Sequence, residues 1–165
     1  DLLRLLKRVD ALVLNDSEAR QLVEEDNVIL ATRKIHRLGP KYVIIKKGEH
    51  GAMFFSEHER YVLPAYPTPR VVDPTGAGDS FAGGMMGHLS AQGRFDPQAL
   101  KEALAYGIVT ASTFWTSDRN PHIFSRPLCV FTFRSRGWHC CLVSRSRWIR
   151  SGRPSTFSVT ASRRS

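Results

Sequence analysis

The stretch that decides the fold is residues 71–84, which read Val71-Val72-Asp73-Pro74-Thr75-Gly76-Ala77-Gly78-Asp79-Ser80-Phe81-Ala82-Gly83-Gly84. Two glycines flank one alanine, and an acidic residue then opens a helical pattern. Glycine accepts positive φ and lets the backbone approach a ligand closely. A helix that begins at such a turn presents unpaired N–H groups and the positive end of its dipole. The turn at Gly76–Gly78 is therefore predicted to bind an anion, and a phosphate suits it.

Asp79 places a carboxylate beside this predicted anion site. A carboxylate would repel a bound phosphate, but it can take a proton from a hydroxyl group that attacks the phosphate. The alternative is a first-turn acid that stabilises its helix by about 0.3–1 kcal/mol, next to an ordinary tight turn. The residues alone leave both interpretations open.

The string from Asp73 to Asp79 closely resembles the signature of the ribokinase-like, or PfkB-type, carbohydrate kinase family. The resemblance implies that Asp79 is the catalytic base and that the amides of Gly76, Ala77 and Gly78 form the anion hole for the transferred phosphoryl group. It covers residues 1–112 and implies the C-terminal, nucleotide-binding half of a three-layer α/β/α sandwich. The sheet is expected to be mostly parallel, and the domain to be incomplete at both ends. The alternation of strand and helix patterns independently favours an α/β fold.

Asn15 follows an apolar run, residues 11–14, that is suited to a buried parallel strand. It would lie at the carboxyl end of that strand, where α/β sheets bind ligands. A capping residue followed by Glu three positions later is also a common helix start, so Asn15 and Glu18 can be explained as a capping box. By resemblance they match the family's Asn-x-x-Glu motif, whose side chains organise the magnesium–phosphate network. Glu18 is thus a predicted cofactor-binding and metal-site residue.

A second buried-strand pattern, residues 42–45, runs into Lys46-Lys47-Gly48-Glu49-His50-Gly51. By resemblance, Gly48 and Gly51 match a Gly-x-x-Gly turn that borders the nucleotide. Lys46 stands where the family often has Thr, but a lysine near ATP phosphates is physically reasonable. A solvated strand end is the alternative for Lys46.

The remaining patterns predict a helix over 28–38, a β-hairpin from 52–55 and 61–63, and two further helices. The helix after Asp79 contains several glycines, each of which costs about 1 kcal/mol relative to alanine. Close packing against the sheet would account for tolerating them. The helix from Asp96-Pro97 to Ala111 is expected, by resemblance, to wall the adenine.

The composition changes near Ser112. Residues 1–111 hold 14 basic and 14 acidic residues, whereas residues 112–165 hold ten Arg, no Lys and one acid, so the whole net charge of +9 lies in the last third. We expect residues 113–165 to be a disordered Arg/Ser-rich tail or the product of a reading-frame shift. A basic nucleic-acid arm is the alternative, although no recognisable module or regular repeat supports it.

The expected function is ATP-dependent phosphoryl transfer to a hydroxyl of a sugar or nucleoside, with Mg²⁺ as a cofactor. Asp73 and Thr75 match two ligands of the monovalent cation (K⁺) that family members often bind. No Walker-type string and no run of eighteen apolar residues is present, and the three cysteines lack metal-ligand spacing. We expect a cytoplasmic protein that begins inside a larger chain. A non-catalytic fragment, and a homodimer of the full-length form, stay open.

Overall fold

The computed structural model describes residues 2–68, 76–115, 131–133, 139–142 and 157–160, the last three segments by their backbone alone. The chain divides into two compact units. The first unit comprises Asp1–Ile45, Phe55–His58 and Pro127–Ser165, and the second comprises Lys46–Phe54 and Glu59–Arg126. The class is mixed α/β, as the alternation of patterns predicts.

Five of the described strands form a mixed sheet with the hydrogen-bonded order β4-β3-β2-β1-β5. Strand β1 (Ala11–Asn15) reaches β2 (Tyr42–Lys46) through two helices, the kind of crossover that parallel neighbours need. By contrast, β3 (Ala52–Phe55) and β4 (Arg60–Leu63) are joined by a short loop, and β1 pairs antiparallel with β5 (Phe131–Phe133). The expectation of a mostly parallel sheet is therefore corrected to a mixed sheet.

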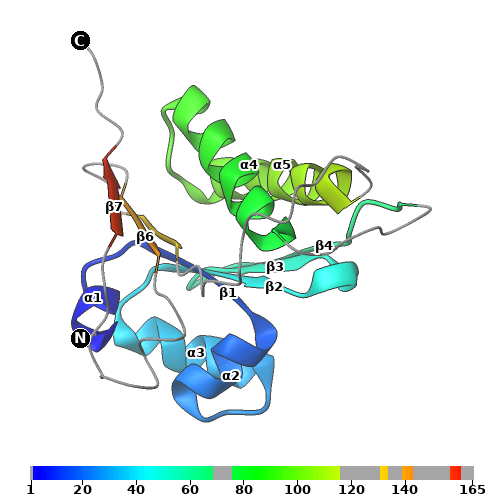
Figure 1. Ribbon diagram of the computed structural model, residues 1–165. Coiled ribbons are helices and arrows are strands. Elements are labelled where there is room, and N and C mark those ends of the chain that lie inside the picture. Colours follow the sequence, from blue (N-terminus) through cyan, green and yellow to red (C-terminus); the bar gives the residue numbers. More distant parts are fainter. Residues whose placement is uncertain (1, 69–75, 116–130, 134–138, 143–156, 161–165) are drawn as a thin grey trace. The chain divides into compact units, whose positions relative to one another are not determined.

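In the first unit, three helices lie on the same side of β1 and β2 (Figure 1): α1 (Leu2–Leu6), α2 (Asp16–Val23) and α3 (Val28–Leu38). Local signals set the helix ends. The Oδ1 of Asn27 accepts hydrogen bonds from the N–H groups of Ile29 and Leu30 and so caps α3. Gly39 ends α3 with φ 140°, and a Cβ there would lie 2.7 Å from the Cα of Lys7. Only glycine fits this close approach.

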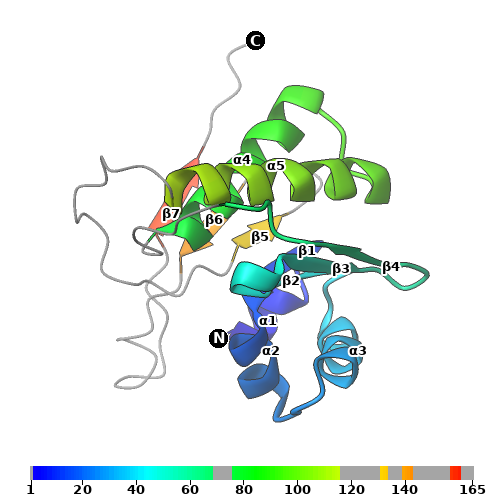
Figure 2. The ribbon, with the colours of Figure 1, turned by 90° about the vertical axis from the view of Figure 1, so that its right-hand side faces the viewer.

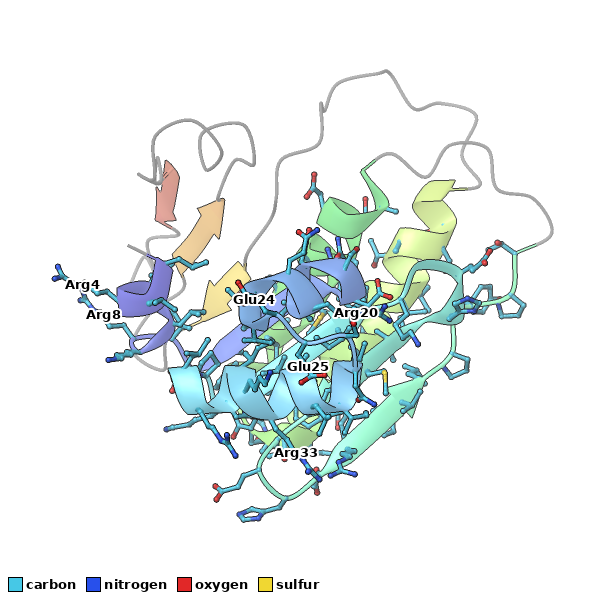
Figure 3. All side chains as sticks on the ribbon, turned by 90° about the horizontal axis from the view of Figure 1, so that it is seen from below. Arg4, Arg8, Arg20, Glu24, Glu25 and Arg33 are labelled. Atoms are coloured by element: carbon cyan, nitrogen blue, oxygen red, sulfur yellow. The ribbon has the colours of Figure 1, made fainter. Side chains whose placement is uncertain are left out.

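Charged side chains project from the helices of the first unit and from the turns that follow them. Figure 3 labels Arg4, Arg20 and Arg33 on α1, α2 and α3, and Arg8, Glu24 and Glu25 just after α1 and α2. Glu25 pairs with Lys34 of α3 at 3.0 Å. The hydrogen bond from Lys34 holds the pKa of Glu25 below its ordinary value. This pair joins the end of the α2 turn to α3. The strands β6 (His139–Leu142) and β7 (Phe157–Thr160) form a separate antiparallel pair.

In the second unit, α4 (Ala77–Gln92) and α5 (Pro97–Trp115) lie side by side (Figures 1 and 2). A Cβ at Gly84 of α4 would lie 2.5 Å from the Oγ1 of Thr110 and 3.0 Å from the carbonyl oxygen of Tyr106, both on α5. A Cβ at Gly107 would meet Met85 and Phe81 of α4 in the same way. The glycines thus allow close contact between two helices, rather than the expected contact between α4 and the sheet. The buried apolar residues of this unit include Phe54, Phe81, Met85, Leu89, Leu100 and Leu104.

Candidate active site

The turn after β2 is shaped by two glycines with positive φ. Gly48 has φ 58° and starts the 3₁₀ helix η1 (Gly48–His50), and Gly51 has φ 89°. A Cβ at Gly51 would overlap the carbonyl oxygen of Leu63 and lie 2.6 Å from the nitrogen of Ala65. The N–H of Lys47 donates to the carbonyl oxygen of Gly51 at 2.8 Å and closes the turn. This turn sets the direction that the chain takes after β2.

Helix α4 begins at Ala77, two residues before the acidic residue expected to open it. Gly76 precedes it in the left-handed conformation, with φ 82°. The first helical hydrogen bond runs from the N–H of Ser80 to the carbonyl oxygen of Gly76 at 2.9 Å. The amides of Ala77 and Gly78 precede this bond, so they belong to the helix end where anions are stabilised.

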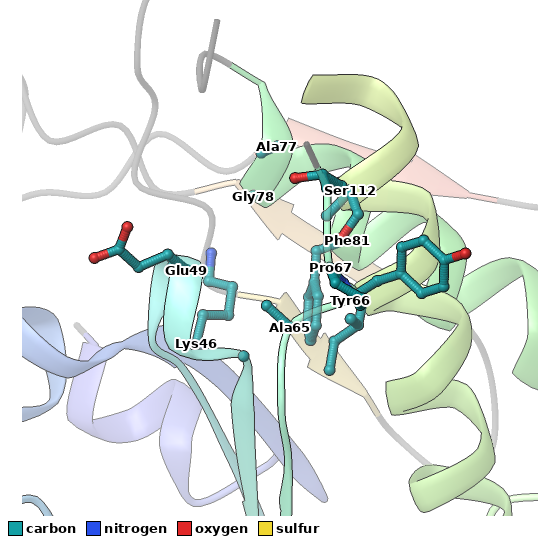
Figure 4. Close-up of a pocket in the computed structure, with 14 residues that line it drawn as sticks. Lys46, Glu49, Ala65, Tyr66, Pro67, Ala77, Gly78, Phe81 and Ser112 are labelled. Atoms are coloured by element: carbon teal, nitrogen blue, oxygen red, sulfur yellow. The ribbon is translucent and has the colours of Figure 1, made fainter. Parts of the chain in front are cut away.

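A cavity of about 310 Å³ lies within the second unit (Figure 4). Lys46 and Glu49 stand on one side of it, and Tyr66, Pro67 and Phe81 on the other. Its lining comes from the turn after β2, the loop after β4, the start of α4 and the end of α5. The lining residues are Lys46, Gly48, Glu49, Gly51, Ala65, Tyr66, Pro67, Thr68, Ala77, Gly78, Phe81, Ile108, Ala111 and Ser112.

The cavity brings together five residues that the sequence predicted for the site: Lys46, Gly48, Gly51, Ala77 and Gly78. They come from two separate stretches of the chain, since Gly51 and Ala77 are 26 positions apart. Asp79 is half-buried in the first turn of α4 but is not among the lining residues. Its position is compatible with the base assignment and with a helix-dipole role, so the base assignment stays a prediction.

Asn15 and Glu18 lie in the first unit and form a capping box. The Oδ1 of Asn15 accepts a hydrogen bond from the N–H of Glu18 at 2.7 Å, and the Oε2 of Glu18 accepts one from the N–H of Asn15 at 2.9 Å. The capping interpretation is thus confirmed, while the role in a magnesium–phosphate network stays a prediction. The predicted cation ligands Asp73 and Thr75 lie outside the described residues.

Reasoning from the sequence missed the part of the cavity wall formed by Tyr66, Pro67 and Thr68. The prolines around them indicated only a connecting loop. Ile108, Ala111 and Ser112 of α5 also line the cavity. The resemblance names this helix as the adenine wall, and that role stays a prediction.

Residues 1–119 match the family described as pfkB family carbohydrate kinase. This chain belongs to that family. The chain is 38% identical over 114 residues to the cytidine kinase of Thermococcus kodakarensis. The aligned residues make up 67% of this chain and 39% of that protein.

Solved structures of family members agree with this result. The aminoimidazole riboside kinase of Salmonella enterica, solved with aminoimidazole riboside and an ATP analogue, matches with a TM-score of 0.65 and 28% identity over 71% of this chain and 39% of that chain. The Arabidopsis thaliana ribokinase, solved with ribose and ATP, matches with a TM-score of 0.63 and 27% identity over 70% of this chain and 38% of that chain. The chain therefore spans about two fifths of the length of these relatives.

Two features are absent from the part of the chain that the structure describes. No helix in this part is long and apolar enough to cross a membrane. Within the same residues, no group of three or more His, Cys, Asp or Glu side chains could hold a metal ion.

Proposed function

We propose that this protein transfers the γ-phosphoryl group of ATP to a hydroxyl of a sugar or nucleoside. The observation that carries the proposal is the cavity, which joins the glycine turn after β2 to the amino end of α4. The relatives named above include a cytidine kinase, an aminoimidazole riboside kinase and a ribokinase, all of which are named for ribose or a riboside. A ribose-containing acceptor is the class we favour.

The cavity offers backbone amides at one end and apolar side chains at the other, which suits the phosphates and the base of a nucleotide. The amides of Ala77 and Gly78 stand at the positive end of a helix and suit a phosphate. Phe81, Ile108 and Tyr66 supply apolar and aromatic surface suited to a base. We therefore orient the phosphates toward Gly78 and the base toward Tyr66 and the end of α5.

Asp79 is proposed to accept the proton of the attacking hydroxyl, because it follows the phosphate-binding amides directly. The amides of Gly76, Ala77 and Gly78 are proposed to stabilise the charge that develops on the transferred group. They are fixed in place by the first turn of α4, so they need no reorganisation during the reaction.

Magnesium neutralises charge on the phosphates of a bound nucleotide. Proteins usually hold Mg²⁺ with only one or two carboxylates together with phosphates and water, rather than with a dedicated cage. Glu18 fits such a role as a single carboxylate, although one of its oxygens already accepts the N–H of Asn15. Asp73 and Thr75 remain the proposed ligands of a monovalent cation.

For the complete domain we propose the three-layer α/β/α sandwich, with residues 1–112 as its nucleotide-binding part. The family match ends at residue 119, which leaves most of the arginine-rich segment outside it. We propose that residues 113–165 arise from a reading-frame shift. Reading the coding DNA in the other two frames tests this, because one of them should then continue the family pattern.

The experiment for the function uses a hybrid that joins residues 1–112 to the unmatched part of the Thermococcus cytidine kinase. Release of ADP that depends on cytidine is measured with the unsubstituted hybrid, with Asp79→Asn and with Asp16→Asn. Asp16 is the control because it is a first-turn acid of another helix, α2.

We expect Asp79→Asn to lower turnover by about 10²–10⁴-fold, as removal of a general base does, while ATP binding is kept. Asp16→Asn should leave turnover near normal. Equal turnover of the two variants would show that Asp79 only stabilises its helix. A folded hybrid without any cytidine-dependent turnover would favour the non-catalytic alternative.

A further inference from the structure

Strand β4 is the least buried of the strands whose side chains the structure describes. None of its four residues is buried, whereas β1, β2 and β3 each bury three residues or more. It also lies at one end of the strand order of the described sheet, next to β3 alone. An element with few buried apolar contacts opens at a low cost in free energy. The position of β4 therefore depends on contacts other than core packing.

Lys101, on the second turn of α5, supplies such contacts. Its Nζ lies 2.7 Å from the Oε2 of Glu59, the residue before β4, and 5.8 Å from the centroid of the Tyr61 ring. The side chain of Lys101 is 23% exposed, so both contacts are partly shielded from water, which strengthens them. One lysine thus ties the start of β4 to α5, and the two elements lie side by side (Figures 1 and 2).

The end of β4 is held at a different place. A Cβ on Gly51 would lie 2.6 Å from the nitrogen of Ala65 and overlap the carbonyl oxygen of Leu63, so the backbone leaves β4 in contact with the glycine turn. A strand held only at that contact could pivot about it. The contacts of Lys101 at the start of β4 remove this freedom, and the two anchors together fix the direction of the strand.

The direction of β4 matters because the cavity wall begins directly after it. Residues 65–68 follow β4 and line the cavity, and the end of α5 lines it with Ile108, Ala111 and Ser112 (Figure 4). Lys101 precedes Ile108 by seven residues, or about two helical turns, on the same helix. It does not line the cavity itself, but it joins the two elements that carry this wall.

We propose that Lys101 is a positioning residue that sets the place of residues 65–68 in the cavity wall. This inference rests on the proposed function and deepens it, because this wall is the one toward which we orient the base. Lys101 then controls the affinity of the cavity for the base of the nucleotide, and not its affinity for the phosphates.

The test uses the 165-residue chain, unsubstituted and as Lys101→Met, Lys101→Arg and Lys34→Met. Methionine removes the charge, whereas arginine keeps it and can stack on Tyr61. Lys34 is the matched control, because it forms another Lys–Glu pair, 3.0 Å from Glu25, and does not line the cavity. Hydrogen exchange, measured by mass spectrometry, follows the amides of β4 and, as an internal reference, those of α4. Calorimetry measures the affinity for ATP, for adenosine and for inorganic tripolyphosphate.

We expect Lys101→Met to speed exchange in β4 by about threefold or more and to leave α4 unchanged. The variant should weaken the binding of ATP and of adenosine by the same factor, about threefold to tenfold, because the binding-competent place of the wall becomes a minor population. Its affinity for tripolyphosphate should change less than about twofold, since the phosphate-binding amides lie on α4. Lys101→Arg should restore both measurements, and Lys34→Met should alter neither.

Several results would overturn the inference. Unchanged exchange in β4 of Lys101→Met would do so directly, as would faster exchange with unchanged affinity for ATP and adenosine. Equal acceleration in β4 and α4 would show that Lys101 only stabilises the fold. A loss for ATP and tripolyphosphate but not for adenosine would show that its charge attracts phosphates from a distance. If the unsubstituted chain binds neither ATP nor adenosine, while Lys101→Met speeds exchange in β4 alone and arginine restores it, the placing of the wall is supported and the proposed function fails.

Discussion

Helix α4 offers a prediction that compares two glycines in one helix. Gly84 faces α5, whereas a Cβ at Gly87 would meet nothing within 4 Å. We therefore compare Gly84→Ala with Gly87→Ala. Both substitutions raise the helix propensity by about 1 kcal/mol, so this gain cancels when the two variants are compared. What is left in the difference is the packing between α4 and α5.

The contacts of Gly84 set the size of that difference. The added Cβ would lie 2.5 Å from the Oγ1 of Thr110, 2.9 Å from its Cβ and 3.0 Å from the carbonyl oxygen of Tyr106. The hydroxyl of Thr110 cannot simply rotate away, because it donates to that same carbonyl at 2.7 Å. Forcing an extra methyl into a close-packed site costs about 1–3 kcal/mol. Gly84→Ala should therefore be about 1–3 kcal/mol less stable than Gly87→Ala.

Urea denaturation followed by circular dichroism measures the two free energies of unfolding. Gly87→Ala should be more stable than the unsubstituted chain, and Gly84→Ala less stable than Gly87→Ala. Adding Thr110→Ala to Gly84→Ala removes the shortest contact and should recover part of the loss. Equal stability of the two glycine variants would refute the close packing of α4 on α5 at this point.

Three other predictions address the site and its supports. Gly51→Ala should cost more than 1 kcal/mol in urea denaturation, because Gly51 has φ 89° and the Cβ would overlap the carbonyl oxygen of Leu63. Asp96→Ala should lower the free energy of unfolding by about 1 kcal/mol, because the Oδ1 of Asp96 accepts the N–H of Ala99 at 2.9 Å and caps α5. Asp96→Asn should keep most of this stability, because asparagine also caps helices. The bond from Ala99 lowers the pKa of Asp96, so its contribution is present above the ordinary carboxyl pKa and is lost as the pH falls through the lowered value, which a pH series of melting temperatures measures. A chain ending at Trp115 should bind ATP as tightly as the full chain in calorimetry, because every lining residue that the structure describes precedes Trp115; a weaker affinity would mean that later residues contribute.

Local patterns predicted most elements correctly. The helix expected over 28–38 is α3, and the strand expected over 42–45 is β2 with one further residue. The sequence signals for these elements are local. The helix has apolar residues at helical spacing and a glycine at its end, and the strand has a short run of apolar residues. The end of α2 at Val23 has no such signal, because the helix ends where Glu24 adopts the left-handed conformation with φ 49°. A non-glycine residue in that conformation carries no recognisable signal in the sequence.

The site could be predicted in part for the same reason. Gly76 and Gly78 were identified because turns with positive φ and close approach need glycine. Gly48 and Gly51 were identified through the resemblance to the family's Gly-x-x-Gly turn. Tyr66 could not be identified, because its approach to the cavity depends on the path of the loop after β4 and not on its neighbours in the chain. The start of α4 at Ala77, ahead of Asp79, likewise depends on the conformation that Gly76 adopts.

The most direct test of the central claim is to locate ATP on the chain. The chain is photolabelled with 8-azido-ATP, digested, and the labelled residues are identified by mass spectrometry. Because the base is oriented toward Tyr66 and the end of α5, the label should fall within residues 64–68 or 108–112, and excess ATP should abolish it. Saturable labelling of residues remote from the cavity, or labelling that ATP does not displace, would contradict the assignment of this cavity as the nucleotide site.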